Sequence, residues 1–356
     1  MTLHQQFTQP LLDWFNIHGR RNLPWQQNCN AYCVWVSEIM LQQTQVKTVI
    51  PYFNRFLSRF PDVESLALAS EDEVLANWSG LGYYSRARNL HKTAIIIHSD
   101  FHGIFPDELP QLIKLPGIGP STAAAIASLA FNQPTAILDG NVKRVLSRYF
   151  LVAGLPKQTA VLKKLWQLAN DCMPHQRCAD YTQAIMDLGA TCCTAKNPNC
   201  TACPLQTTCL ANISNEVTNY PNTSPQKKIP TKQQQFLLMY NEGSQYIYLE
   251  KRPPTGLWGG LWCLPSIDMN ECPITYISET YMLQTENVQE LMSMKHSFSH
   301  FHLRIKALSM QTSQTTNSLV KVSGRWFTLN ETSSLGLAKP MSTIINYFFS
   351  RKSPPS

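Results

Sequence analysis

The stretch LPGIGPSTAAAIASLAF, residues 115–131, predicts two helices joined by a tight turn. Gly117 and Gly119 allow positive φ angles and a close approach of the backbone to a partner, and Pro120 suits the first position of the second helix. Backbone N–H groups that are exposed at such a turn can hold a phosphate. The pattern therefore indicates either a helix–hairpin–helix that grips DNA phosphates without reading sequence, or a plain turn between two helices.

Helical periodicity continues on both sides of this turn up to about residue 212. Apolar residues recur at i, i+3, i+4 and i+7 within residues 142–149 and again within residues 162–169. Proline and glycine separate these segments from one another. We therefore predict a mainly α-helical domain over residues 1–211, with the helix–hairpin–helix at about residues 108–131.

The composition changes after this helical part. Residues 212–232 are polar, contain prolines and lack periodicity, which is typical of a linker. Beyond them, residues 233–253 predict two strands around an Asn-Glu-Gly-Ser turn. Two further segments resemble strands and a third resembles a closing helix: FSHFHLRIKAL (298–308), GRWFTL (324–329) and MSTIINYFF (341–349). We therefore predict a smaller α+β domain over residues 233–350.

The composition as a whole fits a globular protein with a sizeable core. Of the 356 residues, 44% are hydrophobic and 15% are charged, which excludes a disordered chain. The net charge of +7 permits an anionic partner such as nucleic acid without requiring one. No apolar run approaches the ~18 residues of a membrane helix, and the first residues lack the features of a secretory signal. We therefore expect a reducing compartment, in which the eleven cysteines are not paired in disulfides.

Four cysteines form the strongest local signal in the chain. They are Cys193, Cys200, Cys203 and Cys209, with the spacing C-x6-C-x2-C-x5-C. Ligation by sulfur alone favours zinc or an iron–sulfur cluster over hard cations. The long first gap differs from the spacing of zinc ribbons and of common ferredoxins. Spacing alone therefore leaves structural zinc and [4Fe–4S] as near-equal alternatives, and the adjacent Cys192 obscures which neighbour is the ligand.

An aspartate lies twenty residues after Gly119 of the predicted hairpin turn. Asp139 in AILDGNVKRVLSRY immediately precedes the helical pattern that starts at residue 142. An aspartate in that place is a good helix N-cap, and capping alone would explain it. Lys143, Arg144 and Arg148 lie on the same predicted helix, where such residues usually form a solvated face that can also meet phosphates.

A glutamate in SEIMLQQTQV, residues 37–46, is the second candidate acid. Glu38, Gln42 and Gln45 stand at i, i+4 and i+7, so they share one face of a predicted helix. Such a face is either exposed to solvent or an acid beside amide groups that can hydrogen-bond a base edge. The sequence by itself favours the solvent-exposed alternative.

Further motifs accompany these residues in a fixed order along the chain. They are LPW (23–25), VSEIMLQQTQV (36–46), GLGYYSRARNL (80–90), LPGIG (115–119), LDGNVKRV (138–145), MDLGA (186–190) and the four-cysteine array, followed by RPPTGLWGGLWCLP (252–265) and HSFSHFHL (296–303). In this order they closely resemble the adenine DNA glycosylase (MutY) family of the helix–hairpin–helix superfamily, which has a MutT-like C-terminal domain. The resemblance spans nearly the whole chain.

The resemblance implies a fold and an activity. The fold is a mainly α helix–hairpin–helix glycosylase domain with a [4Fe–4S] loop at 193–209, followed by a smaller α+β MutT/Nudix-like domain. The activity is base-excision repair, in which adenine opposite 8-oxoguanine or guanine is hydrolysed from the sugar, preventing G·C to T·A mutation. The implied partner is double-stranded DNA with an A·8-oxoguanine or A·G mispair. The chain is then a monomer without membrane contact in the bacterial cytosol, associated with the nucleoid through DNA.

The resemblance also implies roles for individual residues. Glu38 corresponds to the general acid and Asp139 to the carboxylate beside the sugar. A [4Fe–4S] cofactor corresponds to ligands Cys193, Cys200, Cys203 and Cys209. The implied DNA contacts are Gln42 and Tyr83, which fill or wedge the base stack; Gly117, Gly119, Ser121, Asn141 and Lys143, in the hairpin and the segment after it; and Phe298, Ser299 and His300, which touch the oxidised guanine.

Two departures from related families narrow the expected activity. Glycosylase-lyases of the superfamily carry a lysine just after the hairpin as a Schiff-base nucleophile, whereas this chain has Ser121 there. We therefore expect a monofunctional enzyme that leaves the strand largely uncut. Nucleotide-hydrolysing MutT relatives carry an acidic Mg-binding run, which is absent from residues 265–282; lesion reading remains as the role of that domain.

Two rival interpretations remain at this point. One is an endonuclease III-like lyase that acts on oxidised pyrimidines. The other is a DNA-binding module whose cluster serves redox sensing or charge transfer without catalysis. Ser121 argues against the lyase, and the presence of both Glu38 and Asp139 argues against the module.

Overall fold

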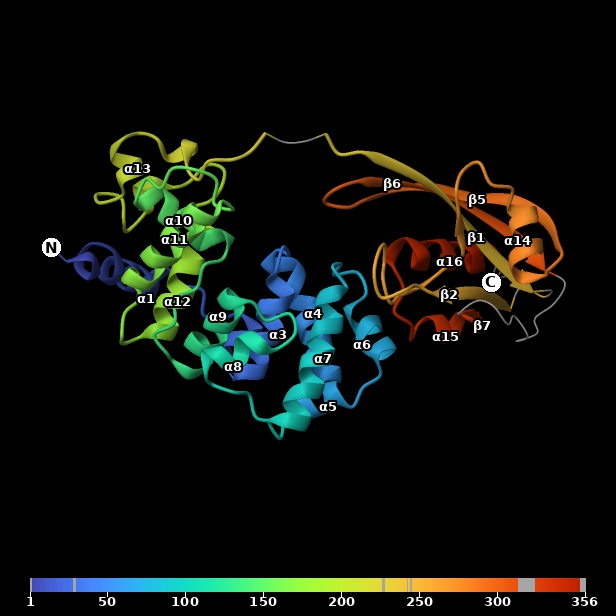
Figure 1. The fold of residues 1–356 in the computed structure, drawn as a ribbon, viewed down its shortest axis with the longest axis horizontal. Coiled ribbons are helices and arrows are strands. Elements are labelled where there is room, and N and C mark those ends of the chain that lie inside the picture. Colours follow the sequence, from blue (N-terminus) through green and yellow to red (C-terminus); the bar gives the residue numbers. More distant parts are fainter. Residues whose placement is uncertain are drawn as a thin grey trace. The chain divides into compact units, whose positions relative to one another are not determined.

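The computed structural model describes residues 2–27, 30–225, 228–241, 243, 245–312 and 324–352. Contacts within the chain divide it into two compact units. One unit comprises Met1–Ala67 and Lys92–Gln226, and the other comprises Leu68–His91 and Lys227–Ser356. The first is helical and the second contains the β-sheet (Figure 1).

Helices dominate the described part of the first unit. Their bounds are η1 His4–Thr8, α1 Gln9–His18, α2 Pro24–Gln27, α3 Ala31–Leu41, α4 Val46–Arg59, α5 Val63–Ala67, α8 Leu109–Lys114, α9 Pro120–Phe131, α10 Gly140–Tyr149, α11 Thr159–Cys172, α12 Cys178–Asp187, η2 Leu188–Cys192, η3 Cys200–Ala202, α13 Leu210–Ile213 and η4 Val217–Asn219. Helix α7, Ser85–Asp100, crosses from one unit into the other. This is the mainly α-helical domain that the sequence predicts.

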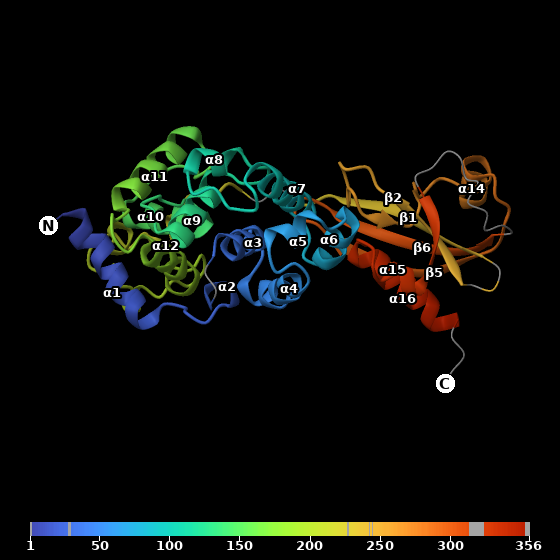
Figure 2. The same ribbon diagram turned by 90° about the horizontal axis from the view of Figure 1, so that it is seen from below.

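Helix α9, the second helix of the predicted hairpin, lies at the centre of this unit. Its residues Ala123–Ala127 are all buried, and it packs against both α3 and α12 (Figure 2). Small side chains let neighbouring helix axes come close together. A buried hydrogen bond of 2.7 Å between the hydroxyls of Ser128 and Thr182 joins α9 to α12. The alanine-rich sequence after the turn therefore serves the core, while the turn itself stays at the surface.

The second unit is built around a mixed β-sheet. Its elements are α6 Glu71–Trp78, β1 Thr231–Asn241, β2 Tyr246–Lys251, β3 Trp262–Cys263, β4 Ser266–Ile267, α14 Pro273–Tyr281, β5 Thr285–Ser297, β6 His302–Thr312, β7 Gly324–Thr328, α15 Leu329–Thr332 and α16 Lys339–Lys352. The strand order is β3-β2-β1-β6-β5, with β4 paired to β1 and β7 paired to β2. Strands β1 and β6 are parallel, and the other pairs are antiparallel.

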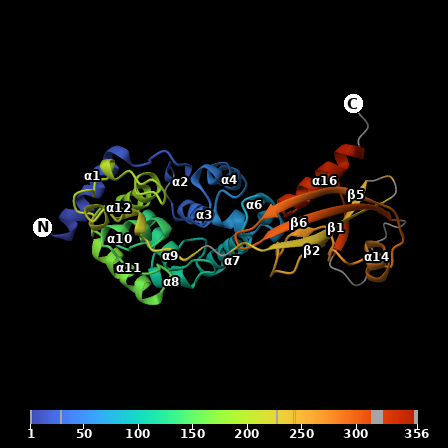
Figure 3. The ribbon, with the colours of Figure 1, turned by 90° about the horizontal axis from the view of Figure 1, so that it is seen from above.

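Strand β1 is buried on both faces of this sheet. Six consecutive residues, Gln235–Tyr240, are buried. Leu237 belongs to an apolar cluster with Ile277 of α14, whereas the ring of Tyr240 lies 4.9 Å from the ring of Phe348 on α16. The two helices therefore cover different faces (Figure 3), which explains a continuous apolar run in place of alternation.

Several predicted elements differ from those in the structure. The segment 298–308 is a strand only from His302 onward, because the N–H of Phe298 donates to the carbonyl of Phe301 (2.9 Å) and closes a turn. The expected linker at 212–232 begins with residues held by the helical unit, since Asn222 accepts a hydrogen bond from the N–H of Gly154 (2.6 Å). Glu242 and Ser244 of the predicted Asn-Glu-Gly-Ser turn lie outside the described residues.

Within the described residues, none of the helices combines the length and the apolar character needed to span a membrane.

Candidate active site and cysteine pocket

Glu38 lies on α3, a helix that is otherwise buried. Every residue from Ala31 to Met40 is buried except Glu38, which is half-buried. Burial raises the pKa of the Glu38 carboxyl to about 7, and the negative charge of Asp139 adds to the rise. Glu38 is therefore not the fully solvent-exposed residue that the spacing favours, whereas Gln45 of the same predicted face is exposed. A carboxyl that is half protonated near neutral pH suits general acid catalysis.

The helix that carries Glu38 also ends earlier than predicted. Helix α3 stops at Leu41, Gln42 is its C-cap, and Gln43 adopts a positive φ of 57°. Gln45 is the N-cap position of the next helix, α4. The predicted i, i+4, i+7 face is therefore interrupted, and only Gln42 stays beside the end of α3.

Asp139 is the N-cap of α10, as its position in the sequence indicates. Its Oδ1 accepts the N–H of Val142 at 2.7 Å, and its Oδ2 accepts the side-chain amide of Asn141 at 3.3 Å. Burial raises the pKa of Asp139, while the N–H groups of Val142 and Asn141 and the charges of Arg144 and Lys143 oppose the rise. The capping role is thus confirmed, and it leaves open a second role for a half-buried carboxylate next to another acid.

The first turn of α9 joins the segments that carry the two acids. The hydroxyl of Ser121 accepts the N–H of Leu138 at 3.1 Å, which fixes the residue directly before Asp139. The side-chain amide of Gln42 donates to the hydroxyl of Thr122 at 3.4 Å, which holds the end of α3. The structure therefore brings the predicted acids together with Gln42 and Ser121 around one helix start.

The predicted hairpin is formed by α8, the turn Leu115–Gly119 and α9. Ile118 is buried and anchors the turn, whereas Gly117 and Gly119 are exposed. Gly117 adopts a φ of +77°, which a residue with a Cβ rarely adopts. A Cβ on Gly119 would meet no atom of the protein within 4 Å, so this side of the backbone is open. An open backbone at the start of a twelve-residue helix is suited to a phosphate group.

The two arginines on α10 are not the solvated face that the sequence indicates. Arg144 donates to the carbonyl oxygens of Cys193 (2.8 Å) and Gly189 (2.6 Å) and to Oδ1 of Asn141 (2.8 Å). A Cβ on Gly189 would lie 2.6 Å from the Cβ of Asn141, so only glycine fits there. Arg144 therefore connects the residue beside Asp139 to the start of the cysteine array.

Arg148, one turn later on α10, is 2% exposed. It donates to Sγ of Cys193 at 3.3 Å and to the carbonyl of Thr194 at 2.7 Å. Its Nε donates to the carbonyl oxygens of Val217 (3.0 Å) and Tyr220 (2.9 Å). Sequence reasoning missed this role, because an arginine with the spacing of a solvated helix face gives no sign of how many carbonyl groups will surround it.

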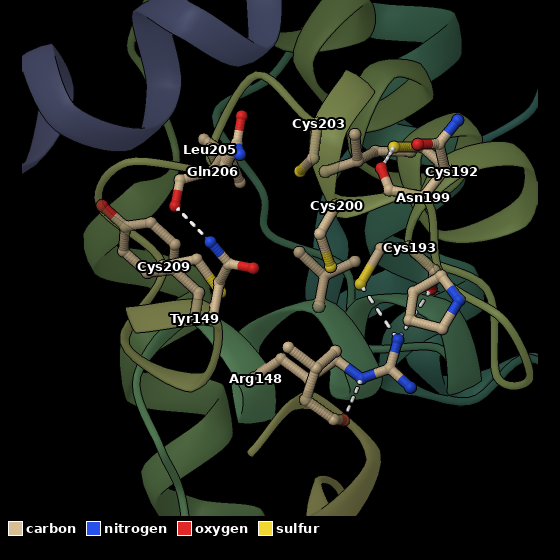
Figure 4. A pocket seen from close by; sticks show the side chains of 15 residues that line it. Arg148, Tyr149, Cys192, Cys193, Asn199, Cys200, Cys203, Leu205, Gln206 and Cys209 are labelled. Atoms are coloured by element: carbon tan, nitrogen blue, oxygen red, sulfur yellow. Dashed lines mark hydrogen bonds between the residues drawn. The ribbon is translucent and has the colours of Figure 1, made fainter. Parts of the chain in front are cut away.

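The four predicted ligands line one pocket together (Figure 4). Burial raises the pKa of the thiols of Cys193, Cys200 and Cys209. Cys192 also lines the pocket, but its thiol donates to the carbonyl of Asn199 at 3.2 Å. Across the described ranges, no three His, Cys, Asp or Glu side chains lie close enough together to hold a single metal ion.

Tyr83 is an exposed aromatic residue in a tight loop of the second unit. Its side chain is 45% exposed and its backbone has a φ of +50°. The guanidinium of Arg86 lies 5.5 Å from its ring and donates to the carbonyl of Gly82 at 3.1 Å. The loop therefore presents a large aromatic ring to solvent.

Phe298, Ser299 and His300 form the turn between β5 and β6. Ser299 and His300 are exposed, and Phe298 is half-buried. Phe298 stacks on Phe301 with ring centroids 4.5 Å apart. The alternative of a plain alternating strand is therefore wrong, since these two rings lie on each other and not on opposite faces.

Two family models match the chain. The model described as HhH-GPD superfamily base excision DNA repair protein matches residues 36–171, and the NUDIX domain model matches residues 235–347. Among solved structures, a thermostable thymine-DNA glycosylase has a TM-score of 0.54 at 27% identity, covering 60% of this chain and 97% of that one. A non-covalent endonuclease III–DNA complex has a TM-score of 0.51 at 22% identity, with 60% and 98% covered. The second likeness shows a shared fold.

Curated relatives match over nearly the full length. An adenine DNA glycosylase of Buchnera aphidicola subsp. Schizaphis graminum is 40% identical over 343 residues, which are 96% of this chain and 98% of that protein. The adenine DNA glycosylase of Homo sapiens is 32% identical over 410 residues, covering 96% of this chain and 74% of that protein. With its helical base-excision-repair domain and its Nudix-like domain, this chain belongs to the adenine DNA glycosylase family, the DNA N-glycosylases that hydrolyse adenine from DNA.

Proposed function

We propose that this glycosylase removes adenine from A·8-oxoguanine and A·G pairs by hydrolysis, without cutting the strand. The observation that carries the proposal is the half-buried Glu38, whose pKa is raised to about 7 by burial and by Asp139. Enzymes that cleave glycosidic bonds commonly use two carboxyl groups in one site. The pair also argues against a DNA-binding module without catalysis.

Glu38 acts as the general acid in this proposal. The glycosidic bond of a stacked adenine is out of reach, so the base must leave the duplex at a cost of a few kcal/mol. Adenine is a poor leaving group until a ring nitrogen is protonated. Glu38 supplies that proton, because its protonated form is still present near neutral pH.

Asp139 stabilises the sugar as the base departs. The sugar develops the positive charge of an oxocarbenium ion, and an ionised carboxylate beside it lowers the energy of that state. The N–H groups of Val142 and Asn141 favour the ionised form of Asp139. Once Glu38 has given up its proton it can accept one from the water that attacks the sugar, which completes hydrolysis.

Ser121 makes the enzyme monofunctional in this proposal. Its hydroxyl accepts the N–H of Leu138 and supports the Asp139 segment, and a hydroxyl in that place lacks the amine that forms a Schiff base. The absence of a lysine at this position distinguishes the proposal from an endonuclease III-like lyase.

Replacing Ser121 with lysine is expected to add lyase activity. An amine beside the Asp139 segment can attack the sugar if its pKa is lowered by burial. Ser121→Lys should therefore cut some strand without alkali and give a DNA adduct that borohydride traps, whereas wild type gives little of either. Strong alkali-independent cutting by wild type would contradict the monofunctional proposal.

A [4Fe–4S] cluster held by Cys193, Cys200, Cys203 and Cys209 is the proposed cofactor. One observation supports the fit: these four thiols line one pocket. Ligation by sulfur alone suits an iron–sulfur cluster, and the resemblance to the family favours the cluster over zinc. A bound cluster would hold the loop 193–209 in place, with Arg148 already fixing the backbone around Cys193.

Iron content tests this assignment. Purified protein is expected to be yellow-brown with about four iron atoms per chain, as for [4Fe–4S] chemistry. Cys203→Ser should lose iron and thermal stability, because a ligand is removed. Cys192→Ser is the matched control and should keep its iron, since its thiol contacts the carbonyl of Asn199. Anaerobically purified protein that contains zinc and no iron would exclude the cluster.

The remaining contacts are proposed to position DNA. We assign the hairpin residues Gly117 and Gly119, together with Asn141 and Lys143, to the backbone of the strand that carries adenine. Gln42 and Tyr83 fill or wedge the gap left by the flipped base. Domain 233–350 reads the opposite base through Phe298, Ser299 and His300, domain 1–211 performs the chemistry, and 212–232 connects them. In this proposal the chain acts as a monomer on chromosomal DNA in the bacterial cytosol.

A single-turnover assay on a short duplex with one A·8-oxoguanine pair tests the proposed activity. Base loss that needs later alkali to cut the strand is the expected result. Direct strand cutting would support the lyase, and the absence of any reaction would support a non-catalytic module. The same duplex with an A·G pair should react more slowly, which tests the proposed lesion preference.

A further inference from the structure

We propose that Trp258 is a positioning residue that fixes the pose of Phe298 and thereby determines how strongly the enzyme prefers A·8-oxoguanine over A·G. The inference rests on the proposed role of the turn Phe298–His300. It concerns residues of 228–352 alone, all within the second unit. Trp258 lies outside that turn, in the segment between β2 and β3.

Phe298 contacts four aromatic rings. Its centroid lies 5.8 Å from Trp258, 4.6 Å from His296, 4.5 Å from Phe301 and 6.4 Å from His300. Trp258 also lies 5.9 Å from His296, so these rings form a cluster in which each contacts another. Ser299 and His300, in contrast, are exposed. The cluster therefore fixes Phe298 at the base of the turn, while the tip stays exposed to solvent, with the ring of His300 4.8 Å from that of Phe301.

The other side of the turn is anchored independently of Trp258. The N–H of His302 donates to the carbonyl of Pro230 at 2.8 Å, where β6 runs parallel to β1. The ammonium of Lys232 lies 5.2 Å from the ring of Phe301. Phe301 is thus held by the sheet, whereas Phe298 has a backbone bond to Phe301 and its ring is held by other rings. Removing a ring should let Phe298 move without unpairing the hairpin.

The backbone at Trp258 is held in an unfavourable conformation. Trp258 adopts a φ of +53°, a conformation that is unfavourable for a bulky residue and persists where the surroundings enforce it. The next residue must be glycine, since a Cβ on Gly259 would lie 2.5 Å from the carbonyl oxygen of Pro254. The indole is 6% exposed and also contacts Phe236 of β1, at 5.9 Å. A strained turn thus holds a large ring between the sheet and Phe298.

The experiment compares Trp258→Leu with Trp262→Leu in the full chain. Trp262 is a matched control, because it is 8% exposed and lies four residues away. Among the described residues, its ring contacts Phe327 (4.8 Å) but not the rings of the turn. The single-turnover rate and the binding constant are measured on duplexes that carry A·8-oxoguanine or A·G. Thermal unfolding of each variant reports on folding.

Trp258→Leu is expected to reduce the preference for A·8-oxoguanine by about tenfold, the size expected when the ring contacts to Phe298 and His296 are lost. Its rate on A·G should stay close to wild type, because the acids are untouched. Trp258→Phe should restore most of the preference. His296→Ala removes a second ring without changing the strained backbone, and it should also lower the preference.

Two outcomes would contradict the role of Trp258. If Phe298→Ala loses the preference while Trp258→Leu and His296→Ala keep it, Trp258 does not position Phe298 and the inference is wrong. If Trp262→Leu lowers the preference as much as Trp258→Leu, the effect is one of general stability, and the inference is again wrong. A wild type without any preference would instead overturn the proposed lesion reading, on which this inference depends.

Discussion

Replacing Glu38 with glutamine is expected to lower the single-turnover rate of adenine release by ~10²–10⁴-fold, the usual contribution of general acid catalysis. Glutamine keeps the shape of the side chain but cannot donate the required proton. Binding of A·8-oxoguanine DNA should be kept, because the hairpin and the turn at Phe298 are unchanged. Rate and affinity measured on the same duplex separate the two effects. If Glu38→Gln remains active, the proton donor must be another group.

The pH profile gives a second test of Glu38. Its pKa is about 7, so the protonated fraction falls as pH rises through 7, and the rate of the wild type should fall with it. The folded carboxyl binds its proton more tightly than an unfolded one, so the free energy of unfolding should also decrease as pH rises through this range. Glu38→Gln should remove both dependences. A wild-type rate that stays constant from pH 6 to 8.5 would contradict the assignment.

The sequence was sufficient for the architecture because the main signals are local. The glycines and the alanine run at 115–131 predict a turn and a buried helix, and the structure has α8, the turn and α9 there. Residues 233–253 likewise predict two strands, and the structure has β1 and β2 there. The same locality explains the error at 298–308, where the backbone reverses direction at residues that have strong strand propensity.

The candidate site was less accessible to sequence reasoning, since it depends on contacts between distant segments. Helical spacing alone favoured an exposed face for Glu38, whereas Asp139 lies close enough to raise its pKa. Arg148 resembles a surface cation until the carbonyl groups of residues 193–195 and 217–220 surround it. Neither the burial of Glu38 beside Asp139 nor the burial of Arg148 can be seen in the sequence around these residues. The catalytic role of Glu38 came from the resemblance to a family and not from its spacing.

Replacing Asp139 with asparagine is expected to have the second large effect on the rate. This variant separates the helix-capping role of the Asp139 carboxylate from its role beside the sugar. Asparagine caps a helix about as well as aspartate, so Asp139→Asn should keep the bond from the N–H of Val142 and the stability of α10. The negative charge beside the sugar is lost, and the rate of base release should fall on the order of 10²-fold or more. DNA affinity should be retained.

Alanine at the same position is the control for capping. Asp139→Ala removes both the cap and the charge, so it should lose activity and also about 1 kcal/mol of stability. Thermal unfolding of wild type, Asp139→Asn and Asp139→Ala then measures how much the cap contributes to stability. Single-turnover kinetics of the same proteins measure how much the charge contributes to the rate. If Asp139→Asn reacts as fast as wild type while Asp139→Ala is merely less stable, then Asp139 is a helix cap and nothing more. In that case, of the two acids, only Glu38 would remain to stabilise the positive charge on the sugar. Glu38 is ionised once it has donated its proton to the base. The mechanism would then require this ionised carboxylate to face the sugar.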